Sequence, residues 1–411
     1  MGDRWKEMKF CDCAELVRET CQPEESFGKP YIGLENIEQG TLRLNSVGIA
    51  EDVTSTKSNF KNGDILFGKL RPYFRKVVRP KFEGICSTDI WVVRAKDGID
   101  QGFLFYWMAS TEFVDIANQG SEGTKMPRAK WDFVAKIKQT IPPLPEQKAI
   151  ASILGTLDDK IELNRKMNET LEAMARAIFK SLFVDFEPIP GFGPHKEWQD
   201  SPLGKIPKGW RVEKVSDICT TQYGYTASAS EEPIGPHFLR ITDMNKEPWI
   251  DWQKVPYCSI NDKDLSKYTL QVGDVLVSRM ADPGKAAIVE DNVNAVFASY
   301  LVRLKTRDLA TAYYLFYFLR SNRYLDYANG VMDGTVQAGM NAKVITAANM
   351  LLPPDNIIIN FLDAIRPLRK KTTDNLKQSL TLASIRDALL PKLLSGEIRV
   401  KDAERFVEET V

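Results

Sequence analysis

The segment from Pro142 to Val184 decides the fold of this chain, and it runs PPLPEQKAIASILGTLDDKIELNRKMNETLEAMARAIFKSLFV. Its apolar residues recur in alternating steps of three and four, interrupted by Asn164 and Asn168, which is typical of a long helix with a coiled-coil seam. Proline disrupts strand ladders and is tolerated in a first helical turn, so Pro142 and Pro143 predict where a strand ends and this helix begins.

The same segment recurs 211 residues later, from Pro353 to Gly396, without insertion or deletion, so that Asn164 corresponds to Asn375. Upstream of each copy, GDILFGK at Gly63 is echoed by GDVLVSR at Gly273, and FLFYWMAS is echoed by YLFYFLRS. A frame repeated in this order predicts an internal duplication in which the segments between the anchors have diverged.

The predicted fold is α+β, with two mixed α/β domains separated by two long antiparallel coiled-coil helices and an internal pseudo-two-fold duplication. In each variable domain, short β-branched runs alternate with Gly, Asn and Pro turn signals, and Phe103 to Ser110 is expected to be a short buried helix. The predicted segments are a first variable domain at 1–141, a central long helix at 142–186, a Pro- and Gly-rich linker at 187–209, a second variable domain at 210–352, a distal long helix at 353–396 and a C-terminal tail at 397–411.

Two long helices of about 35 residues would each span about 50 Å at roughly 1.5 Å per residue. Neither can bury its apolar stripe alone, and the nearest partner is its own copy in the same chain. Chain connectivity favours an antiparallel pair, because the second variable domain starts near the end of the first helix and leads into the start of the second. We expect such a pair to place the variable domains at opposite ends, at a spacing suited to DNA half-sites about 34 to 36 Å apart.

The helices are expected to pair through their apolar seam. The predicted pairing residues are Leu154, Leu157, Ile161, Asn164, Leu171, Ile178, Leu182, Ile365, Leu368, Asn375, Leu382, Leu389 and Leu393. Asn164 and Asn375 occupy equivalent seam positions, and two interpretations stay open: a tolerated polar break near the surface, or a pair that fixes the register at some cost in stability.

Composition indicates a globular protein of two or three domains, with 411 residues, 43% hydrophobic and 27% charged. There is no apolar run of about 18 residues and no signal-peptide stretch at the N-terminus, so we expect a cytoplasmic protein. The formal net charge is +0, so any polyanionic partner must be bound by local patches.

No self-contained active site is expected. Gly63 to Lys69 matches the start of a phosphate-binding P-loop, but Leu70 stands where Ser or Thr must reach magnesium. His195 and His237 have no evident catalytic partner, and the six cysteines form no CxxC pair. We therefore predict no catalytic, cofactor-binding or metal-binding residue in this chain.

The segment Lys69 to Lys81, KLRPYFRKVVRPK, carries six basic residues and no acidic one. Arginine can bind guanine edges and both basic side chains can neutralise phosphates, so the segment is a candidate DNA contact. A weaker counterpart surrounds Arg279, and the loops GTKMPR and GTVQAGMN before each long helix have small residues that let backbone approach a groove. The alternative is an ordinary solvated strand pair with connecting loops. The candidate DNA-binding residues are Lys69, Arg71, Tyr73, Arg75, Lys76, Thr124, Lys125, Arg128, Gln222, Tyr223, Tyr225, Arg279, Lys285, Thr335, Gln337 and Asn341.

Over essentially its whole length the chain resembles the specificity subunits of type I restriction-modification systems. The resemblance is carried by PPLPEQKAIASIL and LDDKIELNRKMNETLEAMARAIFKSLFVDFEP in the middle, by LLPP and ASIRDALLPKLLSGEIRV at the end, and by STDIWVV and QGSEGTKMPR. It implies a prokaryotic defence protein with two target-recognition domains. Each domain would recognise one half of a bipartite asymmetric DNA site, and the helices would set the spacing.

The resemblance also implies that this chain is not catalytic by itself and binds no cofactor. Two modification subunits, which carry S-adenosylmethionine and methylate adenine, would dock on the helices, and restriction subunits using ATP and Mg would translocate and cut DNA. One departure is that Asp355 to Ile358, DNII, stands where the first copy has LPEQ at Leu144 to Gln147, so docking at the two ends is expected to be less symmetric.

Two other functions fit parts of the sequence. A two-headed protein-interaction scaffold without DNA specificity agrees with the zero net charge, and it would show no salt-dependent DNA affinity. A nuclease or methyltransferase with an unrecognised site would cleave or methylate DNA as the isolated chain.

Overall fold

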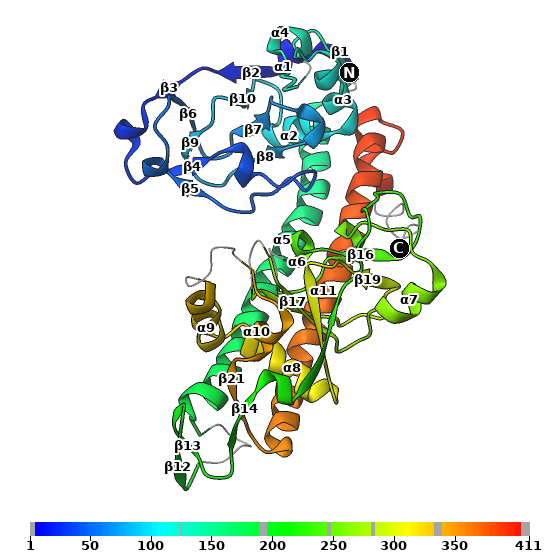
Figure 1. Ribbon diagram of the computed structural model, residues 1–411. Coiled ribbons are helices and arrows are strands. Elements are labelled where there is room, and N and C mark those ends of the chain that lie inside the picture. The colour runs from blue at the N-terminus through cyan, green and yellow to red at the C-terminus, as the bar shows by residue number, and fades with distance from the viewer. Residues whose placement is uncertain are drawn as a thin grey trace. The chain divides into compact units, whose positions relative to one another are not determined.

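The computed structural model describes residues 5–123, 125–188, 195–244, 248–280, 284–332 and 339–403. The chain divides into two compact units, the first comprising Met1–Arg165 and Leu376–Val411 and the second comprising Lys166–Asn375. Each unit contains its own strands and short helices together with a part of each long helix (Figure 1).

The two long helices are α5, Leu144–Lys180, and α11, Asp355–Ser395. Each begins directly after its pair of prolines, as predicted, and α5 passes into a π-helical turn at Ser181–Asp185. The shorter helices are α1 Phe10–Cys13, α2 Gln101–Ala109, α3 Thr111–Gln119, α4 Trp131–Val134, α6 Ile241–Met244, α7 Asp262–Tyr268, α8 Leu309–Leu319, α9 Asn322–Met332 and α10 Ala342–Thr346.

The first unit contains a four-stranded sheet in the order β2-β10-β7-β8, a five-stranded sheet in the order β3-β6-β9-β4-β5 and the pair β1-β11. Its strands are β1 Lys6–Lys9, β2 Ala14–Val17, β3 Thr20–Cys21, β4 Pro30–Ile32, β5 Gly48–Ile49, β6 Lys57–Phe60, β7 Ile65–Gly68, β8 Val77–Val78, β9 Gly84–Cys86, β10 Ile90–Ala95 and β11 Lys138–Ile141.

The second unit contains a four-stranded sheet in the order β15-β20-β17-β18 and the pairs β16-β19, β14-β21 and β12-β13. Its strands are β12 Trp198–Ser201, β13 Gly204–Pro207, β14 Arg211–Lys214, β15 Cys219–Tyr223, β16 His237–Leu239, β17 Val275–Ser278, β18 Ala286–Ile288, β19 Ala295–Phe297, β20 Leu301–Thr306 and β21 Asn349–Leu352.

The internal duplication predicted from the sequence is present in the backbone. The order β2-β10-β7-β8 corresponds to β15-β20-β17-β18, and the registers agree, because Ile90 pairs with Gly68 in the first unit and Leu301 pairs with Ser278 in the second. The parallel pair β4-β9 likewise corresponds to β16-β19.

The prediction of a short buried helix is confirmed in both units. Every residue of α2 after Gln101 is buried, as is every residue of α8 after Leu309. An aspartate caps each helix, since Asp100 accepts a hydrogen bond from the Phe103 amide and Asp308 accepts one from the Thr311 amide. These helices therefore lie inside their units.

Within each unit, the segments of α5 and α11 run antiparallel. In the first unit Asp158 contacts Arg386 and Asn164 contacts Gln378, so the partner number falls as the number along α5 rises. In the second unit the Phe179 and Phe361 rings lie 5.8 Å apart. Among the predicted pairing residues, the buried ones are Leu154, Ile161, Asn164, Leu182, Ile365, Asn375, Leu389 and Leu393. The partly buried ones are Leu157, Leu171, Ile178, Leu368 and Leu382.

The seam asparagines are buried and hydrogen-bonded. In the second unit the Asn375 amide donates to the Asn168 side-chain oxygen at 2.8 Å, and in the first unit the Asn164 amide donates to the Ser379 hydroxyl at 3.2 Å. Ser379 corresponds to Asn168 in the repeat, so these are the same contact in its two copies. Asn164 is 0% and Asn375 1% exposed, so a polar break near the surface is the wrong interpretation. Register fixing stays a prediction.

The prediction of a linker at 187–209 is wrong for its second half. Trp198–Ser201 and Gly204–Pro207 form a hairpin, and Ile206 and the following Trp210 are buried in the core of the second unit. The Pro and Gly content that suggests a linker instead supplies the turn of this hairpin, where Gly204 has a φ of 94°. The predicted tail also packs in part, since Ala403 is buried in the core of the first unit.

We expect Asn168→Ala to lower the free energy of unfolding by about 1–3 kcal/mol, because the buried Asn375 amide loses its acceptor. Urea unfolding of the full chain measures this change. Asn356→Ala, an exposed asparagine in the first turn of α11, is the control and should change stability by less than about 0.5 kcal/mol. Equal effects of the two substitutions would contradict a role for the buried pair.

The double variant Asn168→Leu with Asn375→Leu separates stability from register. A pair that fixes the register predicts a chain that keeps its stability but forms additional oligomers or pairings, visible by size-exclusion chromatography with light scattering. A double variant with an unchanged molecular-mass distribution and unchanged unfolding cooperativity would leave these asparagines as packing residues only.

Candidate nucleic-acid interface

In the first unit, the basic segment and the glycine loop that the sequence singled out separately lie side by side. Leu70 and Arg128 form an antiparallel bridge, and the Arg71 amide donates to the Pro127 carbonyl at 2.7 Å. The Arg71 guanidinium also donates to the Lys125 carbonyl at 3.4 Å. Two segments more than fifty residues apart thus form one surface, and basic residues from both belong to it.

The basic segment turns sharply at Pro72–Phe74, a single turn of 3-10 helix. Arg71 and Arg75 flank this turn in the left-handed region, with φ values of 51° and 48°. Residues other than glycine rarely adopt this conformation, and such strain is found preferentially where a site must hold a fixed shape. The turn leaves the Tyr73 side chain exposed.

Arg75 and Lys76, although predicted to contact DNA, make contacts within the protein. Arg75 Nε donates to the Ala109 carbonyl at 2.6 Å, and its Nη2 lies 3.5 Å from an Asp387 carboxylate oxygen on α11. Burial lowers the pKa of Arg75. Lys76 Nζ donates to the Leu34 carbonyl at 2.5 Å. Both side chains are partly buried and are held by acceptors within the protein.

The second unit contains the corresponding site at Arg279, which follows β17. The Met340 amide donates to the Arg279 carbonyl at 2.8 Å, in the same way that the Ala129 amide donates to the Lys69 carbonyl at 2.9 Å in the first unit. The Arg279 guanidinium lies 5.0 Å from the Tyr223 ring centroid, a cation–π contact. The predicted residues Tyr223 and Arg279 are thus brought together.

The remaining predicted residues of the second unit differ in their contacts and in their exposure. Gln222 accepts from Arg303 and donates to the Lys267 carbonyl, so its amide is used within the sheet. The Tyr225 ring lies 5.4 Å from that of Tyr268. Asn341 is exposed and caps α10. Lys285 is partly exposed. Thr124, Thr335 and Gln337 lie outside the described residues.

Sequence reasoning missed two residues of these surfaces, Asp89 and Tyr300. Arg128 Nε and Nη2 donate to the two carboxylate oxygens of Asp89 at 3.0 and 3.3 Å, and this hydrogen-bonded pair raises the pKa of Arg128. Tyr300 accepts from the Arg279 amide through its backbone carbonyl at 3.0 Å. The signal that could have found them is their shared place in the repeat, one residue before the central strand of each sheet.

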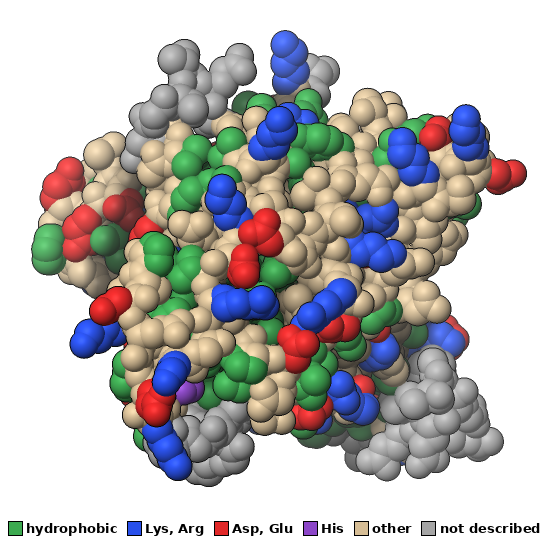
Figure 2. Space-filling view, turned by 60° about the horizontal axis from the view of Figure 1, so that its bottom comes forward, with side chains coloured by type: hydrophobic (Ala, Val, Ile, Leu, Met, Phe, Trp, Pro, Cys, Tyr) green, Lys and Arg blue, Asp and Glu red, His purple; other side chains and the backbone are tan. Residues whose placement is uncertain are grey.

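Charges of both signs are mixed on the surface. On the face drawn in Figure 2, Lys and Arg side chains lie among Asp and Glu side chains, in agreement with the formal net charge of +0. Attraction of a polyanion must therefore come from local groups such as Lys69, Arg71, Lys125 and Arg128 rather than from the charge of the whole chain.

Residues 3–173 match the family model described as the type I restriction modification DNA specificity domain. The MjaIX specificity subunit from Methanocaldococcus jannaschii is 29% identical over 75% of this chain and 71% of its own length. The HindI specificity subunit from Haemophilus influenzae is 26% identical over 83% of this chain and 88% of its own length. Residues 3–173 thus carry a type I restriction-modification DNA specificity domain, and the chain is similar to type I specificity subunits over most of its length.

A solved specificity subunit has the same fold. The crystal structure of the S subunit from M. genitalium is 14% identical to this chain, and the comparison covers 95% of this chain and 96% of that one with a TM-score of 0.54. The likeness extends over both units.

Among the residues that the structure describes, none of the helices combines the length and the apolar character needed to span a membrane. Among the same residues, no three His, Cys, Asp or Glu side chains lie close enough together to hold a metal ion.

In the first unit, a polar triad attaches the variable domain to both long helices. Tyr106 of α2 donates to Asp158 of α5 at 2.6 Å, and Arg386 of α11 donates to the other oxygen of the same carboxylate at 2.6 Å. Burial raises the pKa of Tyr106, so the hydroxyl stays protonated as a donor. One carboxylate thus joins three elements.

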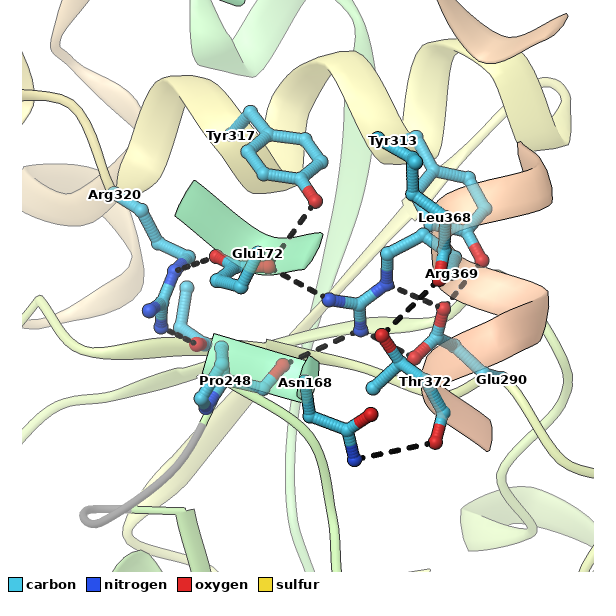
Figure 3. Close-up of polar contacts among 11 residues, drawn as sticks. Asn168, Glu172, Pro248, Glu290, Tyr313, Tyr317, Arg320, Leu368, Arg369 and Thr372 are labelled. Atoms are coloured by element: carbon cyan, nitrogen blue, oxygen red, sulfur yellow. Dashed lines mark hydrogen bonds and ion pairs between the residues drawn. The ribbon is translucent and has the colours of Figure 1, made fainter. Parts of the chain in front are cut away.

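The second unit has a triad of the same chemistry (Figure 3). Tyr317 of α8 donates to Glu172 of α5 at 3.2 Å, and Arg369 of α11 donates to the same oxygen at 2.8 Å. Tyr317 corresponds to Tyr106 in the repeat, but Arg369 corresponds to Asp158. The carboxylate therefore comes from α5 and the guanidinium from α11 in both units, although the helix positions differ.

Arg369 also ties the second variable domain to α11. Its Nε donates to Glu290 Oε1 at 2.8 Å, and the Tyr313 hydroxyl donates to the same oxygen at 2.6 Å (Figure 3). The Arg369 side chain is only 3% exposed. Burial raises the pKa of Glu172, and Arg369 and Arg320 offset part of that rise. A buried cation on α11 thus binds carboxylates from both the variable domain and α5.

We expect Arg369→Met to lower the free energy of unfolding of the second unit by about 3–5 kcal/mol, because Glu172 and Glu290 would stay buried without their cation. Thermal unfolding of the full chain, with hydrogen exchange to locate the change, measures this effect. Arg366→Met, an exposed arginine one turn earlier on α11, should shift stability by less than about 0.5 kcal/mol. A loss as small as that of the control would show that the buried cluster adds no net stability.

We expect Arg75→Ala to destabilise the first unit by about 1–3 kcal/mol and to leave DNA affinity per folded molecule unchanged, because the side chain bonds Ala109 and Asp387. Urea unfolding and DNA titration of the same preparation separate the two effects. A fall in DNA affinity with unaltered stability would return Arg75 to the DNA-binding surface.

Proposed function

We propose that this chain confers DNA sequence specificity on a type I restriction-modification complex, with each variable domain recognising one half of a bipartite, asymmetric site. The observation that carries this proposal is the repeated frame with different surfaces. The four-stranded sheet and the buried helix α2 or α8 recur in both units, while the residues beside Lys69 and Arg279 differ. Two similar domains with different surfaces suit two different half-sites.

Residues 1–141 and 210–352 are the two target-recognition domains in this proposal. The helices at 142–186 and 353–396 form an antiparallel coiled-coil spacer between them. Support comes from the reversed order of contacts between α5 and α11 within each unit and from helices of 37 and 41 residues, about 55 to 60 Å at roughly 1.5 Å per residue.

The DNA-binding surface of the first domain consists of Lys69, Arg71, Tyr73, Lys125 and Arg128. Lysine and arginine neutralise phosphates, and an arginine held in a fixed conformation can also bind a guanine edge. Arg71 suits the second role, since its left-handed backbone and its bond to the Lys125 carbonyl hold it in place.

The surface of the second domain consists of Tyr223, Arg279 and Asn341. It has fewer cations than the first. Recognition there would depend more on base edges and less on phosphate neutralisation, so the two half-sites would differ in the salt dependence of their binding.

Catalysis in this proposal belongs to partner subunits. Two modification subunits carrying S-adenosylmethionine would dock on the long helices and methylate adenine, and restriction subunits would use ATP and Mg to translocate and cut DNA. The sequence DNII at the start of α11, against LPEQ at the start of α5, provides two chemically different docking ends. The complex would act in the cytoplasm.

We expect Arg71→Ala and Arg279→Ala each to weaken binding of the target duplex to the assembled complex by about 1–3 kcal/mol. Titrations at several salt concentrations separate the roles, because loss of a phosphate contact lowers the salt slope by about one and loss of a base contact leaves it unchanged. Arg211→Ala, an exposed arginine on β14, serves as the control. A wild-type complex with equal affinity for all duplex sequences would disprove the proposed function itself.

A further inference from the structure

One solvent-accessible position precedes the same inner strand of the four-stranded sheet in both units. Asp89 comes directly before β10 and Tyr300 directly before β20. The two positions are equivalent in register, because the next residues, Ile90 and Leu301, pair with the last residues of β7 and β17. The equivalence therefore follows from the backbone pairing and does not depend on sequence similarity.

In the first unit this position lies inside the basic surface. The Lys69 amide donates to the Asp89 carbonyl at 2.9 Å, and Arg128 binds the Asp89 carboxylate through two nitrogens. The pair is open to solvent, with side-chain exposures of 47% for Arg128 and 29% for Asp89. An acid among Lys69, Arg71 and Arg128 weakens attraction for phosphates, so phosphate binding gives no reason for its presence.

In the second unit the same position lies between two of the predicted DNA-binding residues. The Arg279 amide donates to the Tyr300 carbonyl at 3.0 Å, and the adjacent Ser299 amide donates to the Tyr225 carbonyl at 2.8 Å. The Tyr300 side chain is 58% exposed. A large aromatic residue that stays mostly in water contributes little to folding, so the core of the unit gives no reason for its presence.

The residues that flank this turn on both sides are buried in both units. Cys86 and Phe297 end the strands before this turn, and Ile90 and Leu301 begin the strands after it; all four are buried. The turn therefore sits on a buried frame common to both units, while the exposed residue that it presents is an acid in one and an aromatic in the other. Such a position is suited to determining what each surface binds.

We propose that Asp89 and Tyr300 are specificity-determining residues, one for each half of the DNA site. Asp89 accepts a hydrogen bond from a cytosine N4 amine while Arg128, oriented by the same carboxylate, binds the paired guanine. Tyr300 contacts a base edge through its ring, for which the thymine methyl is the natural apolar partner. This inference rests on the proposed function, since it assigns the bases that the two domains would recognise.

The test uses the full chain with its modification subunit in a strain where methylated adenines are mapped across the genome. Asp89→Asn retains the size of the side chain but removes the charge, and asparagine favours adenine over cytosine. It should change base preference at one position of one half-site by roughly 5- to 150-fold and leave the other half-site as in the wild type. Tyr300→Ala should change only the other half-site.

Matched controls lie at the far ends of the same sheets. Asp97 is an exposed acid in the turn after β10, and Val272 is an exposed apolar residue in the turn before β17. Asp97→Asn and Val272→Ala should leave the methylated sequence unchanged. Tyr300→Phe retains the ring and should keep the wild-type preference.

Selection from a randomised duplex library by the purified complex decides the case if a variant no longer methylates. A changed preference confined to one half-site supports the assignment. An unchanged preference, a uniform loss of affinity for all sequences or a change in both half-sites overturns it. A wild-type complex that selects no bipartite sequence would instead disprove the proposed function, so the two failures are distinguishable.

Discussion

A carboxylate on α5 held by a buried arginine on α11 is the interaction on which each unit of this structure depends. Asp158 with Arg386 serves the first unit, and Glu172 with Arg369 serves the second. A tyrosine from the buried helix of the variable domain joins each pair, so the domain and both long helices meet at one cluster. Because a buried charge without its partner is costly, these clusters restrict how a domain can lie on its helices. A recognition surface needs such a restriction if it is to meet DNA at a defined angle.

The arrangement of charges on the helices departs from the symmetry of the duplication. Arg369 stands at the repeat position of Asp158, yet both carboxylates of the triads lie on α5 and both arginines on α11. Two copies of an ancestral helix have thus acquired complementary charges. Complementary helices favour the pairing of α5 with α11 over the pairing of either helix with its own kind, which suits a chain that contains both. The asparagine contacts in the two units add a polar match at the same seam.

The recognition surfaces follow the opposite rule, since their frame is common and their exposed residues differ. Backbone bonds join the turn before the central strand, the residue after β7 or β17 and the loop before the long helix in both units. In the first unit this frame carries basic side chains and one acidic side chain. In the second unit it carries tyrosines and one arginine. The zero net charge of the chain is compatible with DNA binding because only these small surfaces need a positive local charge.

Local patterns determined a large part of this protein from the sequence alone. The long helices, their starting points after the paired prolines, the buried helices α2 and α8 and the duplication were all predicted. Periodicity and repetition can be recognised without knowledge of distant contacts. The tertiary structure decided the rest. It engaged Arg75 and Lys76 in contacts within the protein, with Asp387 and Leu34, which lie far away in the chain. It placed Asp89 beside Arg128 through strand pairing, and it made a hairpin of residues predicted to be a linker. Such outcomes depend on contacts between distant segments, which no local pattern of residues specifies.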